Sequence, residues 1–154
     1  MNTTVSSTPS IEPWLRGTHT DVPAVGRAVL HALELALEDI RKWTDGLTDA
    51  EAHAQPLGLP AVSFHLKHIA RSIDRILTYA EGRQLTADQL AGMKGEQSGS
   101  EALADLVGEV QAALGNAAPR VRALAGGNYD ESRGGGRKQL PNSIGGALIY
   151  LADH

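Results

Sequence analysis

The sequence predicts an all-α protein, a four-helix bundle preceded by an N-terminal arm. Apolar residues recur at helical spacing in four segments, glycine and proline separate these segments, and no run alternates apolar and polar residues over the length of a strand. A domain of about 150 residues buries roughly 70% of the surface that its unfolded chain exposes, so the 154 residues suffice for one core. We expect an arm over residues 1–20 and a bundle over residues 21–154.

Capping residues, glycines and prolines mark the bounds of the first elements. Residues 1–20 are rich in Ser, Thr and Pro and offer only Trp14 and Leu15 as one small docking point. Asp21 is a plausible N-cap for a first helix that carries an apolar stripe as far as Trp43, and Gly46 ends it. The stretch 47–60 contains two prolines and one glycine, which predicts a loop with at most one short helix starting at Thr48.

Three further helices are expected. Pro60 opens the second, whose stripe runs over residues 62–80, and residues 92–99 then form a connection. Ser100 caps the third, which Pro119 is expected to kink. Residues 129–139 form a loop, and Pro141 starts a fourth helix that reaches His154 without a stop signal, so we expect this helix to be truncated.

Composition excludes several classes of function. The formal net charge of -4 and the absence of long basic runs disfavour nucleic acid as a partner. Without cysteine the chain has no disulfide, thiolate nucleophile or Cys-type zinc site, which leaves histidines and carboxylates as metal ligands. The first ten residues lack the features of a signal peptide and no apolar run is long enough for a membrane span, so we expect a cytoplasmic protein without membrane contact.

Histidines carry most of the chemical content. His65 and His68 lie three residues apart on the second helix, where side chains are neighbours, and helical geometry places His65 nearer the apolar stripe than His68. His154 lies on the apolar face of the last helix and is expected to point inward. Three inward histidines from two helices suffice for a catalytic zinc-type site, although hydrogen-bonded core histidines are the commoner alternative.

The other histidines predict less. His31 lies near Glu34 and Glu38 on the first helix, which is compatible with outer carboxylate partners but is more typical of a solvated face without a role in metal binding. His19 and His53 fall in expected loops and are interpreted as surface residues.

Two segments resemble a known family. Residues 59–77, LPAVSFHLKHIARSIDRIL, look like the second helix of the DinB/YfiT-like metalloenzymes, and residues 140–154, LPNSIGGALIYLADH, look like the start of their fourth helix. The resemblance implies a four-helix bundle with a divalent metal held by one histidine of the second helix and two histidines of the fourth, four residues apart. His68 and His154 match the first two ligands, the third would lie four positions after His154, and His65 is the second choice on the second helix.

The resemblance also implies a function. The superfamily includes transferases and isomerases that use low-molecular-weight thiols, so we expect a divalent metal, zinc or nickel, and a metal-dependent transferase or hydrolase of small molecules. A homodimer is expected as well. The alternative from another class is a non-catalytic helical module for ligand binding or dimerisation, in which the histidines only fill space.

Overall fold

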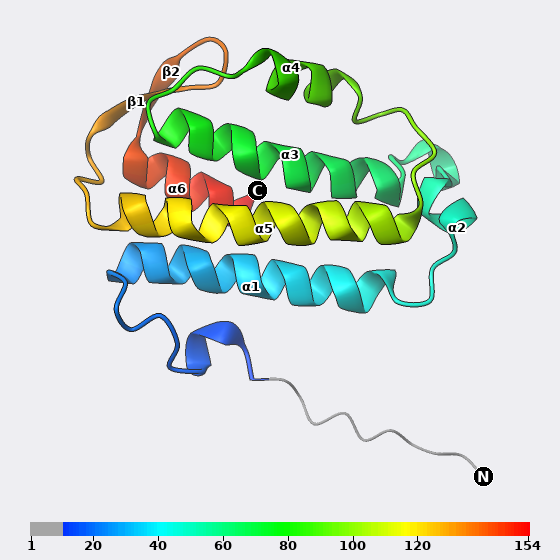
Figure 1. Ribbon diagram of the computed structural model, residues 1–154, viewed down its shortest axis with the longest axis horizontal. Helices are drawn as coiled ribbons and strands as arrows, with labels where there is room; N and C mark the ends of the chain where they lie inside the picture. The colour runs from blue at the N-terminus through cyan, green and yellow to red at the C-terminus, as the bar shows by residue number, and fades with distance from the viewer. Residues whose placement is uncertain (1–10) are drawn as a thin grey trace.

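The computed structural model describes residues 11–154, so the first ten residues of the expected arm lie outside the described residues. Within that range the chain is mostly helical, with one small two-stranded sheet (Figure 1). In chain order the elements are η1 (Pro13–Leu15), α1 (Ala24–Thr44), α2 (Asp49–His53), η2 (Pro56–Gly58), α3 (Val62–Ala80), α4 (Ala87–Lys94), α5 (Leu103–Ala125), β1 (Ser132–Gly135), β2 (Leu140–Ser143) and α6 (Ile144–Asp153).

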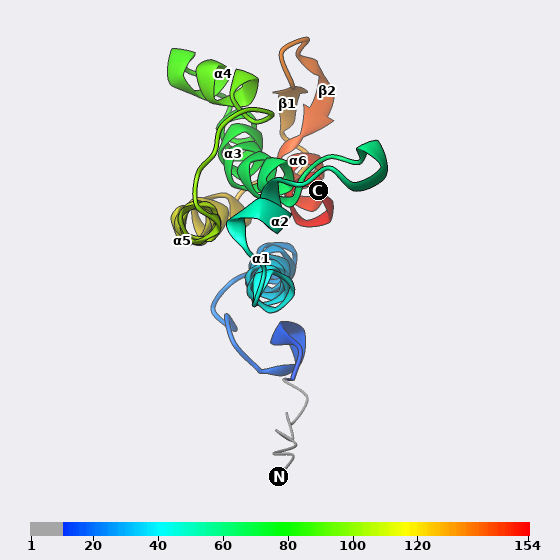
Figure 2. The same ribbon diagram turned by 90° about the vertical axis from the view of Figure 1, so that its right-hand side faces the viewer.

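Helices α1, α3, α5 and α6 enclose the hydrophobic core. Helix α5 packs against α1 and α3, and the shorter α6 packs against the same two helices from the other side. Figure 2, an end-on view, shows α1 and α3 diagonally opposite with α5 and α6 between them. The apolar stripes supply the buried side chains, among them Val29, Leu77, Leu106, Val110 and Leu148. Removal of this apolar surface from water is the main force that holds the helices together.

One close approach fixes the spacing of α1 and α5. A Cβ atom added at Gly26 would collide with the Cβ of Ala125 and lie 3.1 Å from Cγ1 of Val22. The two helices therefore meet backbone to backbone at this point, where only glycine fits.

Two short helices, α2 and α4, accompany the four helices that enclose the core. The expected helix after Thr48 is confirmed as α2, which begins with a capping box between Thr48 and Glu51. Helix α4 was not expected from the apolar spacing, although it starts with the same device, between Thr86 and Gln89. Helix α5 has Ala102 rather than Ser100 at its N-cap and continues through Pro119.

The hairpin corrects the expectation of an all-α chain. Strands β1 and β2 pair antiparallel, with Ser132 opposite Ser143 and Gly135 opposite Leu140. Strand β1 lies in the expected loop, and β2 lies where the last helix was expected to begin. Pro141 therefore lies in a strand, and the last helix starts only at Ile144. Ser143 is its N-cap, and the Ser143 hydroxyl accepts a hydrogen bond from the Gly146 N–H at 3.1 Å. Glycine-rich strands have no alternating pattern that a sequence can reveal.

The segment before α1 is held by residues other than those expected. Trp14 and Leu15 are 48% and 69% exposed, so the docking point predicted there is wrong. Pro13 is buried, and Arg16 donates two hydrogen bonds to the carboxylate of Glu38 on α1, at 2.6 and 2.8 Å. The boundary between arm and bundle at residue 20 stays a prediction. None of the helices described here is both long and apolar enough to cross a membrane.

Candidate functional site

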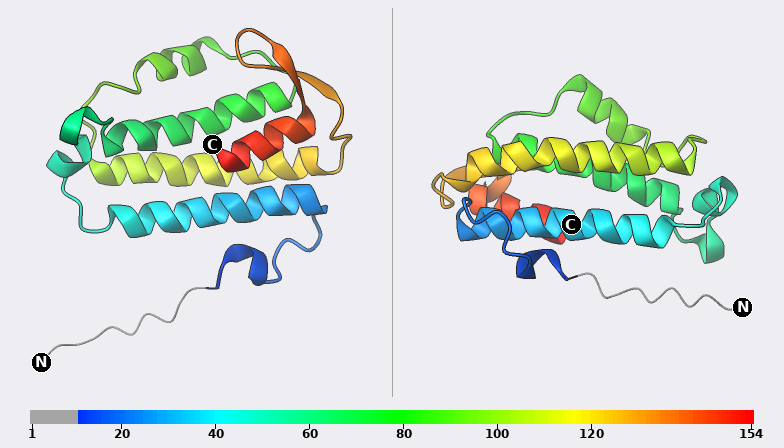
Figure 3. Two further views of the ribbon diagram at one scale, coloured as in Figure 1. Left: turned by 180° about the vertical axis from the view of Figure 1, so that it is seen from behind. Right: turned by 60° about the horizontal axis from the view of Figure 1, so that its bottom comes forward.

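Two histidines from distant parts of the chain meet at the end of α6. Nε2 of His68, on α3, lies 3.0 Å from Nε2 of His154, and the two ring centroids are 5.0 Å apart. Figure 3 shows why: α6 runs beside α3 and ends near the middle of that helix. The ring of Tyr150, one turn earlier on α6, packs on His154 at a centroid distance of 5.1 Å.

A buried carboxylate holds His68. Oε2 of Glu96 accepts a hydrogen bond from Nδ1 of His68 at 2.8 Å, and Oε1 accepts one from Arg75 at 2.6 Å. Glu96 is only 5% exposed, in the connection between α4 and α5. Because the carboxylate accepts a hydrogen bond from Nδ1–H, a neutral His68 has its lone pair on Nε2, the nitrogen that faces His154.

The electrostatics favour a charged Glu96 and a neutral His154. Burial raises the pKa of Glu96, but the hydrogen bonds from His68 and Arg75 outweigh burial and hold the pKa below that of an ordinary glutamate. His154 is exposed as a residue, but partial burial of its ring, followed by repulsion from His68 and Arg75, holds its pKa below the usual value. A neutral imidazole is the form of histidine that binds metals.

The histidine pair lies at a cavity of about 470 Å³, within the size range of small-molecule sites. Helix α3, the hairpin and α6 supply most of its walls. Ile76, Met93 and Leu140 give the lining an apolar part, and polar groups converge on it from Ser72, Arg75, Tyr79, Asn142, Tyr150 and the two histidines. An apolar cavity with a few convergent polar groups is typical of a ligand or active site.

A second cavity, of about 700 Å³, is lined by α2, the start of α3 and the connection between α4 and α5. Its lining includes Lys67, which is 2% exposed and whose ammonium group bonds the carbonyl oxygen of Ser98 and the carboxylate of Glu101. Glu96 also lines this cavity. The ammonium group is thus paired despite its burial, as buried charges require.

His65 does not join His68. It is exposed, whereas His68 is half-buried, so the expectation that His65 lies nearer the core is wrong. Contacts with the hairpin, α4 and α6 cover the His68 side of α3, which a single apolar stripe does not reveal. His53 lies in α2 rather than in a loop, with Nε2 at 2.9 Å from the carbonyl oxygen of Glu101.

A second histidine cluster lies on the opposite side of the core. His31 is only 4% exposed, so its assignment to a solvated face is wrong. One ligand atom each from His19, His31 and Glu34 lie within 4.8 Å of one another, a spacing at which the three side chains can share a metal ion. The (i, i+3) spacing of His31 and Glu34 was visible in the sequence; the approach of His19 was not.

Glu96 and Arg75 are the residues that sequence reasoning missed at the His68 site. Arg75 lies about two helical turns after His68 on α3. It is only 8% exposed, and its charge does not suggest such burial. Glu96 stands in a glycine-bearing connection with no periodic pattern around it. Arg75 lies on the same face of α3 as His68, but no spacing rule brings Glu96 to either residue, because that contact depends on how the connection folds over α3.

Comparison with known proteins identifies the class. The model of the DinB superfamily matches residues 32–154. The chain therefore belongs to the DinB superfamily, as the resemblance of its second and fourth helical segments implied. No curated protein and no solved structure gave a significant match.

Proposed function

We propose that this chain is a divalent-metal-dependent enzyme acting on small molecules, a four-helix bundle of the DinB type whose metal is held by His68 and His154. The observation that carries the proposal is the meeting of two Nε2 atoms, 3.0 Å apart, at a cavity of about 470 Å³. Membership of the superfamily, over residues 32–154, supports the same reading.

The donor set fits a metal of the zinc or nickel class. Imidazole nitrogens suit both ions. Bonds of 2.0–2.1 Å in tetrahedral geometry separate two ligand nitrogens by about 3.4 Å, so the observed 3.0 Å requires only a small rotation of either ring. The carboxylate of Glu96 behind His68 is the outer partner that metal-binding histidines usually have.

The chain's own residues define the chemistry at this site. A bound divalent metal lowers the pKa of water or of a thiol, which makes either a nucleophile at neutral pH. Glu96 fixes the tautomer of His68, and Arg75 compensates the charge of Glu96. The apolar wall can hold the non-polar part of a substrate, while the hydroxyl groups of Tyr79 and Tyr150 and the amide of Asn142 can orient its polar part. We infer a thiol-dependent transferase or a hydrolase.

Metal titration tests the site. We expect zinc or nickel to bind the wild type, His68→Ala to lose most affinity at this site, and His154→Ala to behave alike. His65→Ala, on the same helix but exposed, is the matched control and separates the second-choice ligand from the first. Equal affinity of His68→Ala and wild type would remove the assignment. Absence of metal binding at the pair would leave the non-catalytic helical module.

We also propose a homodimer and a small-molecule substrate such as a low-molecular-weight thiol. Large apolar side chains remain exposed at both ends of the described chain, including Ile11, Trp14 and Leu15 before α1 and Ile149 on α6, and a partner subunit would cover such groups. Sedimentation equilibrium at tens of micromolar protein, suited to association of about 1 µM affinity, checks it. A single species of 16.3 kDa would contradict the dimer.

A further inference from the structure

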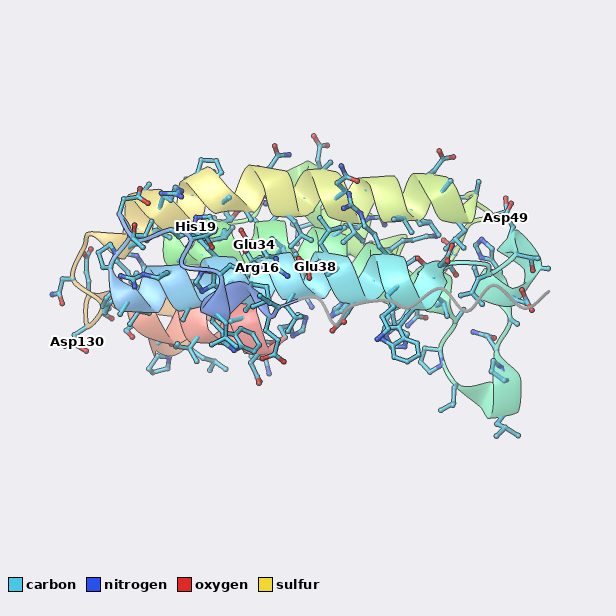
Figure 4. All side chains as sticks on the ribbon, turned by 90° about the horizontal axis from the view of Figure 1, so that it is seen from below. Arg16, His19, Glu34, Glu38, Asp49 and Asp130 are labelled. Carbon is cyan, nitrogen blue, oxygen red and sulfur yellow. The ribbon has the colours of Figure 1, made fainter. Side chains whose placement is uncertain are left out.

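The cluster of His19, His31 and Glu34 joins the N-terminal segment to α1. Figure 4 shows Arg16 and His19 of this segment lying over α1 beside Glu38 and Glu34. Nε2 of His19 lies 2.6 Å from Oε1 of Glu34, and the rings of His19 and His31 are 5.4 Å apart. Two imidazoles and one carboxylate form a ligand set that zinc sites use, with a further position for water.

The backbone around His19 is built to place this side chain. His19 has a φ of 56°, in the left-handed region that costs a residue with a Cβ about 1 kcal/mol or more. The turn brings Thr18 and His19 together onto α1, where Oγ1 of Thr18 lies 3.1 Å from Nε2 of His31. The imidazole of His31 is only 4% exposed and has this hydroxyl group as a polar partner.

Arg122 of α5 determines which nitrogen of a neutral His19 carries the proton. Its guanidinium donates to Nδ1 of His19 at 2.8 Å and to Asp21 at 2.7 Å. Because a guanidinium only donates, Nδ1 must accept, and a neutral His19 then carries its proton on Nε2 and donates it to Glu34. This proton occupies the place that a cation would take between the two side chains.

The geometry points to a second divalent-cation site formed by His19, His31 and Glu34, which clasps the N-terminal segment to α1 when zinc is bound. Zinc bound at Nε2 of His19 would require the other neutral tautomer of this ring. The Nε2 proton would leave to solvent and Nδ1 would take one proton from solvent, with no net change, once Arg122 turns to Asp21 alone. Ligand atoms of a tetrahedral zinc lie about 3.4 Å apart, so His19 and Glu34 need to separate by less than about 1 Å from their 2.6 Å contact.

This site is independent of the function proposed above. Residues 19 and 31 precede the region that matches the superfamily, which starts at residue 32, so membership does not account for them. The cluster also lies across the core from the His68–His154 pair, since α1 and α3 occupy opposite corners in Figure 2. Its effect would be structural: the ion joins residues 12 positions apart and adds to the contacts of Arg16 and Arg122 that help to hold the segment.

The first experiment is a zinc titration by calorimetry in the His68→Ala/His154→Ala protein, which lacks the pair. We expect one zinc equivalent to remain bound. Adding Glu34→Gln, which keeps the shape of the side chain, or His19→Asn, which tolerates the left-handed turn, should weaken it by more than the roughly 10–100-fold that loss of an outer partner costs. His65→Ala is the control, and Arg122→Met should tighten binding because it frees Nδ1.

The second experiment measures how well zinc protects the N-terminal segment from proteolysis by holding it to α1. Zinc should slow trypsin cleavage after Arg16 in the His68→Ala/His154→Ala protein, and a chelator should restore it, while the same zinc leaves cleavage of the His19→Asn derivative unchanged. No zinc binding to the double variant, or binding indifferent to Glu34→Gln and His19→Asn, overturns the inference without touching the His68 site. Zinc binding that depends on Glu34 but not on His68 would instead sustain the clasp and contradict the proposed function.

Discussion

Nδ1 of His68 and Oε2 of Glu96 lie 2.8 Å apart although 28 residues separate them in the chain. This contact predicts the effect of Glu96→Gln. A neutral amide still fills the space but no longer raises the basicity of the imidazole, so metal affinity at the pair should fall by about 10–100-fold. Zinc titration checks the loss, with Glu109→Gln, which breaks the half-buried pair with Arg71, on the same helix as His68, as the control. Unchanged affinity would show that Glu96 does not position His68.

The contact between α1 and α5 predicts a size limit at Gly26. Gly26→Ala should lower the free energy of unfolding by about 1–3 kcal/mol, because the new methyl group meets Ala125 in a packed interface. Ala125→Gly in the same protein should recover part of the loss. Gly115→Ala, on α5 with nothing near its Cβ position, should be neutral or stabilise by up to about 1 kcal/mol. Urea denaturation distinguishes the three, and a tolerated Gly26→Ala would contradict the close approach.

Arg120 links α5 to α3 through two carboxylates. Its guanidinium lies 2.6 Å from Oε1 of Glu81 and 2.6 Å from Oδ1 of Asp74. Arg120→Met should lower the free energy of unfolding by about 2 kcal/mol, the range for hydrogen bonds to charged groups. Arg83→Met removes another cation from the same Glu81. The Arg83 side chain is 58% exposed, so we expect the free energy of unfolding to change by no more than about 0.5 kcal/mol. Equal effects would contradict this ranking.

The same pair predicts a dependence of stability on pH. Burial raises the pKa of Glu81, yet the hydrogen bonds from Arg120 and Arg83 outweigh it and leave the pKa below the ordinary 4.5. A lowered pKa adds stability that is fully present above pH 4.5 and disappears as the pH falls through the folded-state pKa. The difference in unfolding free energy between wild type and Arg120→Met should therefore shrink between pH 7 and about pH 3. A constant difference would contradict it.

A third ligand should strengthen the His68–His154 pair. Appending one helical turn that carries a histidine four residues after His154 places an imidazole on the same face of α6, one turn on. Three protein ligands are the usual complement of a catalytic zinc site, so zinc affinity should rise by at least 10-fold, about 1.4 kcal/mol. An extension with alanine at that position is the control. Equal binding by both extensions would contradict the ligand assignment to this face.

The sequence predicted the long helices because their apolar residues recur once per turn. The stripe from Val62 to Ala80 and its stop at Gly82 give α3 nearly as observed, and Thr48 correctly marks the start of α2. The hairpin and α4 were missed for one reason. Neither has an apolar face of its own, since β1 reads Ser-Arg-Gly-Gly and none of the residues of α4 is buried.

The site was half predictable. His68 and His154 followed from resemblance, and the structure brings them together. The burial of Lys67 and Arg75 did not follow, because a helix with one apolar stripe predicts charged residues in water. These cations are buried because the connection after α4 folds over α3 and supplies Glu96, the carbonyl group of Ser98 and Glu101 as partners. Such partners depend on tertiary structure alone.

The carboxylate of Glu96 serves two compartments at once. It lines the cavity of about 700 Å³ beside Lys67, while its oxygens bond His68 and Arg75, which line the cavity of about 470 Å³. A molecule that entered the larger cavity could donate a hydrogen bond to Glu96 or accept one from its partners His68 and Arg75. Either contact would change how strongly Glu96 accepts the hydrogen bond from His68. The two cavities are thus electrostatically linked, because one carboxylate lines the first and bonds two side chains that line the second.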